Sequence, residues 1–366
     1  MPRRIVTEDG TRFWITEVEL PPLQAGEIRV RVTFAAPKHG TESQAITGSP
    51  FQTKQWDSEM RLFLPRPETP ASAAQPPQPR GIGNVVVGEV IEVGADVTRF
   101  QPGDRVFGSG QIAEIVQAAE TKFRPLSTLT PVDAVCTEPG HVAFVAVRDG
   151  NIRIGDDVAV FGLGAIGLLT IQVAKAAGAH RVFGIDPLPA RRDYALQHGA
   201  DAAFDPREQD AAVAIKHATG KHGVDVAIET SGNGRALNDA IRCLRQCGTV
   251  VHVPWGPRDG TDLKLGEEFH HNRPTLVGSQ AWEGWGNPDR SHPLWDPERA
   301  YQATIELFRE GRITGEGIVT PIVSFEEAPT VLPTIFTDPS RSIKIGVALI
   351  GLYQVVTGER VRRPEL

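Results

Sequence analysis

Three glycines in the middle of the chain have the spacing of a dinucleotide-binding turn. Gly162, Gly164 and Gly167 form a G-x-G-x-x-G pattern directly after the apolar run DVAVF at residues 157–161. A strand before the glycines and a helix after them make this pattern far more specific than the glycines alone. The first glycine permits a tight turn, the second lets the backbone approach a pyrophosphate, and the third allows close packing of helix on strand. The free N–H groups at the start of that helix would bind the phosphates.

An acidic residue follows the next apolar run, as in NAD-binding sites. Asp186 comes after residues 181–185 (RVFGI) and lies 19 positions beyond Gly167. Its carboxylate is placed to accept hydrogen bonds from the adenosine ribose and would repel a 2′-phosphate, so we predict NAD as the cofactor. Arg191 and Arg192 either offset this repulsion or form the solvated start of a helix near the adenine.

The elements around these residues alternate between strands and helices. We expect strands at 157–161, 181–185, 224–228 and 249–253, and helices at 168–177, 191–198 and 236–244. Such alternation indicates βαβ units and a doubly wound parallel sheet of the α/β class, which is a Rossmann-type domain.

The two ends of the chain have a different pattern. Polar and apolar residues alternate through residues 1–60, and strand patterns resume at 85–93, which predicts a small β-barrel. Between them, residues 64–82 contain six prolines and are predicted to form either a surface loop or a poorly ordered excursion. The tail is mixed, with expected helices at 297–309 and 328–336, the second despite Pro333, and expected strands near 320–323 and 342–350.

Composition narrows the classes of function. The 366 residues are enough for two domains, and a formal net charge of −7 gives no basic surface for nucleic acid. The sequence has no run of about 18 apolar residues to cross a membrane and no secretory signal. Its three cysteines argue against a disulfide framework and fit a reducing compartment. We therefore expect a cytoplasmic protein that acts on a small molecule and binds neither nucleic acid nor membrane.

Several further segments match one enzyme family in order and spacing. They are 88–94 (GEVIEVG), 103–106 (GDRV), Glu138-Pro139, the glycine turn at 162–167, and 225–232 (DVAIETSG). Through these segments the chain resembles the medium-chain dehydrogenase/reductase family, in its zinc-type alcohol and polyol dehydrogenase branch, along nearly its whole length.

This resemblance implies two domains with the active site in the cleft between them. A GroES-like β-barrel catalytic domain would comprise residues 1–138 and 282–366, and the Rossmann NAD-binding domain residues 139–281. Homodimers or homotetramers, joined through the last Rossmann strands, are also implied. Lys344 matches the basic residue that reaches the cofactor phosphates. The expected cofactor-binding residues are Gly162, Gly164, Ala165, Ile166, Gly167, Asp186, Arg191, Thr230, Val251 and Lys344.

The zinc ligands of the family are largely replaced in this sequence. His39 stands in place of the first ligand, a cysteine, and Asn84 and Val85 stand in place of a His-Glu pair. Only Glu138 remains, and the four-cysteine lobe that would hold a structural zinc after Phe107 is missing. Because a catalytic zinc needs three protein ligands, chiefly His, Cys or carboxylate, we predict that no metal is bound.

Without zinc, hydrogen-bond donors must stabilise the alkoxide charge that develops during hydride transfer. His39, with Thr41 as a relay, is predicted to exchange the substrate proton. Asn84 would donate its amide to the substrate oxygen. Glu138 would orient His39 or His141, which lies one helical turn further on if this segment is helical. His39, His141 and Glu138 also have a structural alternative, as packed or paired side chains.

Tryptophans gather in one segment near the end of the predicted cofactor domain. Residues 281–295 contain three of the six tryptophans, which indicates either a site or a buried packing corner. Trp282 and Trp285 are expected to face the cleft, where flat aromatic rings would suit a ring-shaped substrate. Glu42 is expected to help position the substrate, and His252 to line the site.

We therefore predict an NAD-dependent, zinc-independent oxidoreductase that interconverts a secondary alcohol and a ketone by hydride transfer. The alcohol would be a polyol, a cyclitol or a sugar derivative. A zinc-free enone or quinone reductase is the alternative enzyme, although Asp186 disfavours the NADPH that such enzymes usually use. A non-catalytic NAD-binding protein is the alternative from another class, and NADH binding without turnover of any alcohol would favour it.

Overall fold

The chain forms two compact units in the computed structural model. One comprises Met1–Val135 with Val319–Leu366 and is called the barrel unit; the other, Cys136–Ile318, is called the sheet unit. The structure describes residues 1–38, 40, 42, 53–66, 78–255, 260–282 and 295–349. None of the helices in these ranges combines the length and the apolar character that a membrane span requires.

The sheet unit is built on six parallel strands. Their spatial order is β13-β12-β11-β14-β15-β16, which changes direction between β11 and β14. The strands are β11 (Asp157–Phe161), β12 (Arg181–Ile185), β13 (Ala202–Phe204), β14 (Val224–Glu229), β15 (Leu244–His252) and β16 (Thr275–Gly278). Val158, Ala159 and Val160 are all fully buried, as expected for a parallel strand that is covered on both faces. The predicted doubly wound α/β sheet is confirmed.

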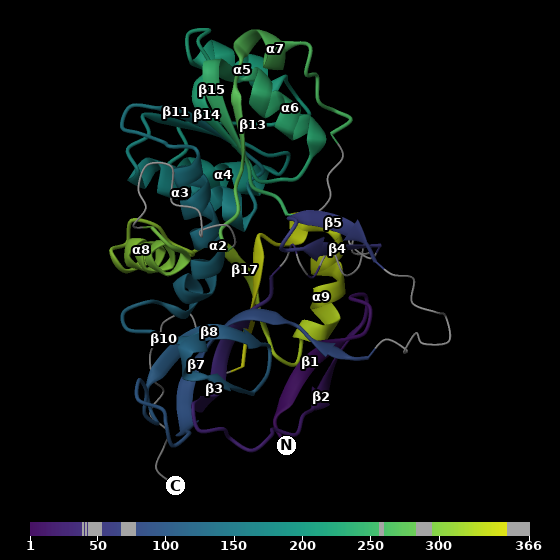
Figure 1. Ribbon diagram of the computed structural model, residues 1–366, viewed down its shortest axis with the longest axis vertical. Helices are drawn as coiled ribbons and strands as arrows, with labels where there is room; N and C mark the ends of the chain where they lie inside the picture. Colours follow the sequence, from purple (N-terminus) through teal and green to yellow (C-terminus); the bar gives the residue numbers. More distant parts are fainter. Residues whose placement is uncertain are drawn as a thin grey trace. The chain divides into compact units, whose positions relative to one another are not determined.

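Helices cover both faces of this sheet (Figure 1), with α5, α6 and α7 on one side and α3 and α4 on the other. The helices are α3 (Ala165–Ala176), α4 (Pro189–Gln197), α5 (Ala211–Ala218), α6 (Gly234–Arg242) and α7 (Glu268–Asn272). Ile215 of α5 and Ile241 of α6 share one apolar core with Phe161. On the opposite face Gly184 lies against Ile171 of α3. The helix predicted at 236–244 lies two residues too far toward the C-terminus, because Leu244 already pairs with Val224 as the first residue of β15.

Two more helices belong to the sheet unit by their contacts. Helix α2 (Pro131–Asp149), in which the boundary between the units falls, contains Pro139 and was not predicted. Helix α8 (Pro297–Arg309) has the predicted bounds. Its Tyr301 hydroxyl lies 2.8 Å from Thr137 Oγ1 of α2, and its Phe308 ring fills the space beside Gly140. These contacts are with α2, and residues 295–318 belong to the sheet unit, whereas the sequence predicted that the barrel domain resumes at residue 282.

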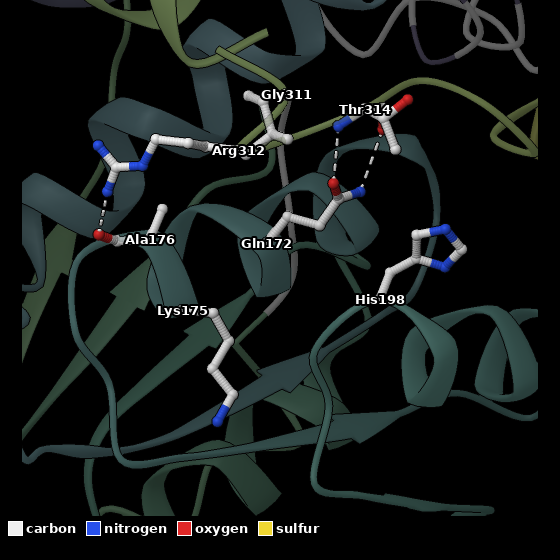
Figure 2. Close-up of a pocket in the computed structure, with 8 residues that line it drawn as sticks. Gln172, Lys175, Ala176, His198, Gly311, Arg312 and Thr314 are labelled. Atoms are coloured by element: carbon white, nitrogen blue, oxygen red, sulfur yellow. Dashed lines mark hydrogen bonds between the residues drawn. The ribbon is translucent and has the colours of Figure 1, made fainter.

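A glutamine side chain fastens the segment after α8 to α3. Gln172 is 6% exposed; its Nε2 donates to the Thr314 carbonyl (3.1 Å), and its Oε1 accepts from the Thr314 N–H (2.8 Å). Figure 2 shows this two-point contact at the wall of a surface pocket, with the Lys175 side chain directed away from Gln172. Gln172, the first pocket residue of α3, lies about 10 Å along the helix from its first residue, Ala165, since each helical residue rises about 1.5 Å. The pocket is therefore separate from the predicted cofactor site.

The barrel unit joins the two ends of the chain. Its main sheet has the order β10-β8-β7-β3-β18-β17, with β9 also paired to β3. The strands are β3 (Glu27–Ala36), β7 (Gly83–Val93), β8 (Arg105–Gln111), β9 (Ile115–Ala119), β10 (Phe123–Pro125), β17 (Val319–Ser324) and β18 (Lys344–Ala348). Val347 of β18 pairs antiparallel with Ala35 of β3. The C-terminal strands are thus an integral part of the N-terminal barrel.

Smaller elements complete the barrel unit. They are β1 (Arg3–Thr7), β2 (Phe13–Glu17), β4 (Lys54–Asp57), β5 (Leu62–Pro65), β6 (Arg80–Gly81) and α9 (Ala328–Thr337). Helix α9 forms despite Pro333, as predicted, and Phe336 packs on Phe13 of β2 with ring centroids 5.7 Å apart. The predicted loop at 64–82 begins in β5 and ends in β6, and residues 67–77 of it lie outside the described ranges.

Candidate functional site

The glycine turn has the geometry of a dinucleotide cradle. Gly162 has φ +88°, and a Cβ added there would lie 2.7 Å from Ser231 Cβ. A Cβ on Gly167 would lie 1.8 Å from the Gly162 carbonyl oxygen, so that position must be glycine for the turn to close. A Cβ on Gly164 would meet no protein atom within 4 Å. The first and third glycines therefore shape the turn, whereas the second leaves open space above it.

That open space lies at the start of helix α3. Gly164 is the N-cap residue and provides no side-chain hydrogen bond to the first turn. The first N–H groups of a helix have no intrahelical partner, and they concentrate partial positive charge at its N-terminus. Ala165 and Ile166 are the first two residues of α3, as the predicted phosphate site requires. The residues present fit a bound pyrophosphate.

Asp186 connects the turn to the end of β12. It is 4% exposed, its Oδ2 accepts from the Leu163 N–H, and its Oδ1 accepts from the Leu188 N–H, both at 2.8 Å. A carboxylate can accept about four hydrogen bonds, so both oxygens keep capacity for a ligand. Arg191 Nη1 lies 3.7 Å from Asp186 Oδ2. Asp186 therefore orders the glycine turn in addition to its predicted contact with ribose.

The second arginine has a different partner. Arg192 Nη1 donates to the Asp186 carbonyl at 2.8 Å and to Asp205 Oδ2 at 3.0 Å, and its side chain is 17% exposed. Arg207 also donates to Asp205, and this hydrogen bond keeps the pKa of the Asp205 carboxyl below its ordinary value. Arg192 is therefore paired with Asp205 and is not a solvated residue at the start of α4.

The loop after β14 closes over the turn. Thr230 Oγ1 donates to the Gly162 carbonyl at 2.8 Å, and a Cβ on Gly167 would lie 3.0 Å from Thr230 Oγ1. Val251 is fully buried, and its side chain lies beside Gly150 at the end of α2. Both residues were predicted to contact the cofactor. The Thr230 hydroxyl instead holds the glycine turn, and the buried Val251 can contact a ligand only through its backbone.

The barrel unit holds the residues that replace the zinc ligands of the family. Ala36, the last residue of β3, pairs with Val85 of β7, so the segment from Pro37 onward leaves β3 beside Asn84. Val85 is 5% exposed. Lys344 Nζ donates to the Pro37 carbonyl at 3.0 Å. His39 and Thr41 lie outside the described residues.

Glu42 and Lys344 both have partners within this unit. Glu42 is 5% exposed, and its Oε2 accepts from Arg80 Nη1 at 3.0 Å. Lys344 is 4% exposed and holds the Pro37 carbonyl. The predicted contact of Lys344 with the cofactor phosphates and the predicted substrate contact of Glu42 stay predictions.

Helix α2 brings one predicted catalytic residue to one predicted substrate residue. Glu138 and His141 lie one turn apart on α2. The segment is therefore helical, as the predicted interaction between these two residues requires. His141 is fully buried, with Nε2 3.1 Å from the Ala281 carbonyl oxygen. Its ring centroid lies 4.5 Å from that of Trp282, a residue that is 45% exposed, and 5.4 Å from that of Tyr301. Trp285 lies outside the described residues.

The comparisons with known proteins agree over most of the chain. Residues 25–140 match the alcohol dehydrogenase GroES-like domain, and residues 165–288 match the zinc-binding dehydrogenase domain. The D-guloside 3-dehydrogenase of Escherichia coli (strain K12) is 39% identical over 346 residues, which are 91% of this chain and 96% of that protein. This chain belongs to the medium-chain, zinc-type alcohol dehydrogenase family.

Two further similarities support the same family and fold. The (R,R)-butanediol dehydrogenase of Bacillus subtilis (strain 168) is 27% identical over 343 residues, covering 86% of this chain and 90% of that protein. The crystal structure of 2R,3R-butanediol dehydrogenase from Bacillus subtilis has a TM-score of 0.72 at 23% identity, covering 96% of this chain and 100% of that one. The predicted medium-chain oxidoreductase, with its GroES-like and Rossmann parts, is confirmed.

The described residues of this family member do not fit the zinc that the family name implies. An amide and a buried aliphatic side chain, Asn84 and Val85, occupy the positions of a His-Glu pair, and neither type is a customary zinc ligand. Within the described ranges, no three His, Cys, Asp or Glu residues gather as a metal site. We therefore assign no step of the reaction to a metal.

Sequence reasoning missed three residues of this medium-chain dehydrogenase that contact predicted ones. Tyr301 lies beside His141, and Arg80 pairs with Glu42. Glu229, at the end of β14, lies beside His252. A tyrosine in a helix and an arginine after a proline-rich loop have no local signature, but an acidic residue at a strand end beside the glycine turn is a signal that could have been used.

Proposed function

We propose that this protein is an NAD-dependent dehydrogenase of sugars or glycosides, which oxidises a secondary ring hydroxyl to a ketone without catalytic zinc. The observation that supports it most directly is the 39% identity with D-guloside 3-dehydrogenase over 91% of the chain. The half-exposed Trp282 beside His141 adds an aromatic surface of the kind that binds sugar rings.

The reaction divides between cofactor and protein. When bound, NAD would supply the acceptor for the hydride of the carbinol carbon, which would become the carbonyl carbon as the hydroxyl proton left to a base. The glycine turn and Asp186 would hold the pyrophosphate and the adenosine ribose. His39 receives the proton, directly or through Thr41, and Asn84 donates its amide to the oxygen on which charge develops. Glu138 and His141 shape the surroundings of that proton transfer.

A substrate panel tests the proposal. We expect NADH formation from NAD and glycosides or sugars with free ring hydroxyls to exceed that from 2-propanol or 2,3-butanediol by at least about tenfold in kcat/KM, which is about 1.4 kcal/mol. Absorbance at 340 nm measures the rate, and NMR of the product identifies the oxidised carbon. Turnover confined to enones or quinones with NADPH would support the reductase alternative instead.

Cofactor choice follows from the charge on Asp186. We expect the native protein to bind NADH more tightly than NADPH, because a carboxylate beside the ribose repels a 2′-phosphate. Asp186→Asn should lower the ratio of the NADPH to the NADH dissociation constant by about tenfold, or about 1.4 kcal/mol. Fluorescence titration with both reduced cofactors measures this ratio.

A matched control separates this local effect from a change of net charge. Asp193 is exposed on α4 of the same unit, so Asp193→Asn removes the same charge and should leave the ratio unchanged. Native protein that binds NADPH as tightly as NADH would contradict the assignment of NAD.

A further inference from the structure

A buried carboxylate and a histidine lie side by side at the carboxyl edge of the parallel sheet. Glu229 is the last residue of β14, His252 is the last residue of β15, and the two are paired in register. The Glu229 side chain is fully buried, and its Oε2 lies 3.1 Å from His252 Nδ1. In the described part of the chain neither of these two buried atoms has an aligned hydrogen bond. At this distance, a small rotation of either side chain would form a hydrogen bond between them.

The remaining contacts of Glu229 determine what it can offer His252. Its Oε1 accepts from the Ser231 N–H at 2.6 Å, the Ser231 hydroxyl at 2.5 Å and the Gly232 N–H at 2.8 Å. All three donors point at Oε1, so Oε2 of this carboxylate is left to accept a hydrogen bond from His252. A carboxylate beside Nδ1 places the imidazole proton on Nδ1, which leaves Nε2 with a lone pair. In this arrangement, Nε2 of His252 is a hydrogen-bond acceptor.

The place of the pair in the sheet indicates what would meet that acceptor. In a doubly wound sheet the dinucleotide lies across the carboxyl ends of the strands, at the point where the strand order reverses. Here that point is between β11 and β14, with Asp186 on the β12 side. The β14 and β15 edge therefore faces the half of the dinucleotide away from the adenosine. Ser231, which Glu229 holds, packs directly on Gly162 of the cradle.

The exposure of His252 agrees with contact to a ligand. Its side chain is 25% exposed although Nδ1 is buried, so the exposed part lies on the rest of the ring, which includes Nε2. Nicotinamide riboside presents two kinds of donor, the ribose hydroxyls and the carboxamide N–H groups. An acceptor fixed at this edge is complementary to either.

We propose that His252 accepts, through Nε2, a hydrogen bond from the nicotinamide riboside half of the cofactor, and that Glu229 is the positioning residue that fixes the tautomer of His252. The proposal rests on the proposed binding of NAD. It adds a contact to the half of the dinucleotide that the glycine turn and Asp186 do not reach.

Binding measurements on the whole protein test the role of His252. For His252→Ala we expect the dissociation constant of NADH to rise about tenfold while that of ADP stays within about twofold, because ADP lacks the nicotinamide riboside. ADP-ribose, which has the second ribose but no carboxamide, distinguishes the two donors. If His252→Ala binds ADP-ribose more weakly than the native protein does, the donor to Nε2 is a ribose hydroxyl; if the affinity is unchanged, the donor is the carboxamide. Equal weakening of NADH and ADP, or no weakening of NADH, would overturn the proposal. His222→Ala, at an exposed histidine of the same unit, is the matched control.

A conservative change tests Glu229. The amide in Glu229→Gln keeps an oxygen for Ser231 and Gly232, but its N–H group would donate to Nδ1 and turn Nε2 into a donor. We expect NADH binding to weaken selectively, as in His252→Ala, with the melting temperature within about 2 °C of the native value. Lower thermal stability with native NADH affinity would show a structural role only. If the native protein bound neither NADH nor ADP, the proposed function would fail; native binding that these variants leave unchanged would contradict this inference alone.

Discussion

Gly164→Val should weaken NADH binding by about 10²-fold or more, which is at least about 2.7 kcal/mol, while the protein stays folded. A Cβ at this position meets no protein atom within 4 Å, and the backbone there, with φ −71° and ψ −172°, is open to any L-residue. The free protein therefore has no reason to need glycine. The valine methyl groups would occupy the space in which a pyrophosphate approaches the start of α3.

The third glycine of the same turn provides the contrast. A Cβ on Gly167 would lie 1.8 Å from the Gly162 carbonyl oxygen, so Gly167→Ala should lower both the melting temperature and the affinity for NADH. Calorimetric melting and fluorescence titration of both variants separate the two effects. Native NADH affinity in Gly164→Val would show that the open space is not where the cofactor binds.

His39→Ala should lower turnover by about 10²- to 10⁴-fold, the range expected for loss of a general acid–base group. The sequence places His39 two residues after Pro37, whose carbonyl Lys344 holds at the end of β3, and where the family has a metal-binding cysteine. Something at that position must exchange the substrate proton when no metal does so. The dissociation constant of NADH should stay unchanged, because the glycine turn belongs to the other unit.

Controls distinguish this chemical role from a structural one and from a metal. Thermal melting of His39→Ala should match that of the native protein, whereas a structural histidine would lose stability and keep turnover in the folded fraction. Zinc measured by elemental analysis should be substoichiometric, and activity should survive chelators. One tight zinc per chain, or full activity in His39→Ala with none in His141→Ala, would contradict the assignment.

Local patterns were sufficient to predict the parallel sheet and the cradle within it. The run at 157–161 is apolar because β11 is covered on both faces, and the glycines that follow show the spacing of a dinucleotide-binding turn, in which Gly167 is required by its contact with the nearby Gly162 carbonyl. Helix α2 was missed because Pro139 and Gly140 normally break helices. Gly140 is there for a tertiary reason: the Phe308 ring of α8 lies 2.8 Å from where its Cβ would be.

Contacts between distant residues were beyond sequence reasoning. Glu229 and His252 meet only because β14 and β15 are parallel neighbours in a particular register, which no local pattern specifies. In the same way Asp186 was predicted as a ribose ligand, but its hydrogen bond to the Leu163 N–H depends on how β12 lies beside β11. The replaced zinc ligands were visible in the sequence, since residue type alone decides whether a side chain can bind a metal.

The pairing of β18 with β3 has a consequence for how this protein is made. A ribosome releases Ala35 long before it synthesises Val347, the residue with which Ala35 pairs. Until then the end of β3 at Phe34 and Ala35 lacks its β18 partner, and an unpaired strand edge is a template for aggregation. The sheet unit, encoded between the two halves of the barrel, can form its own core during this interval. The main sheet of the barrel can therefore be completed only after residues 344–348 have been made, so the N-terminal strands wait for a partner while the sheet unit is synthesised.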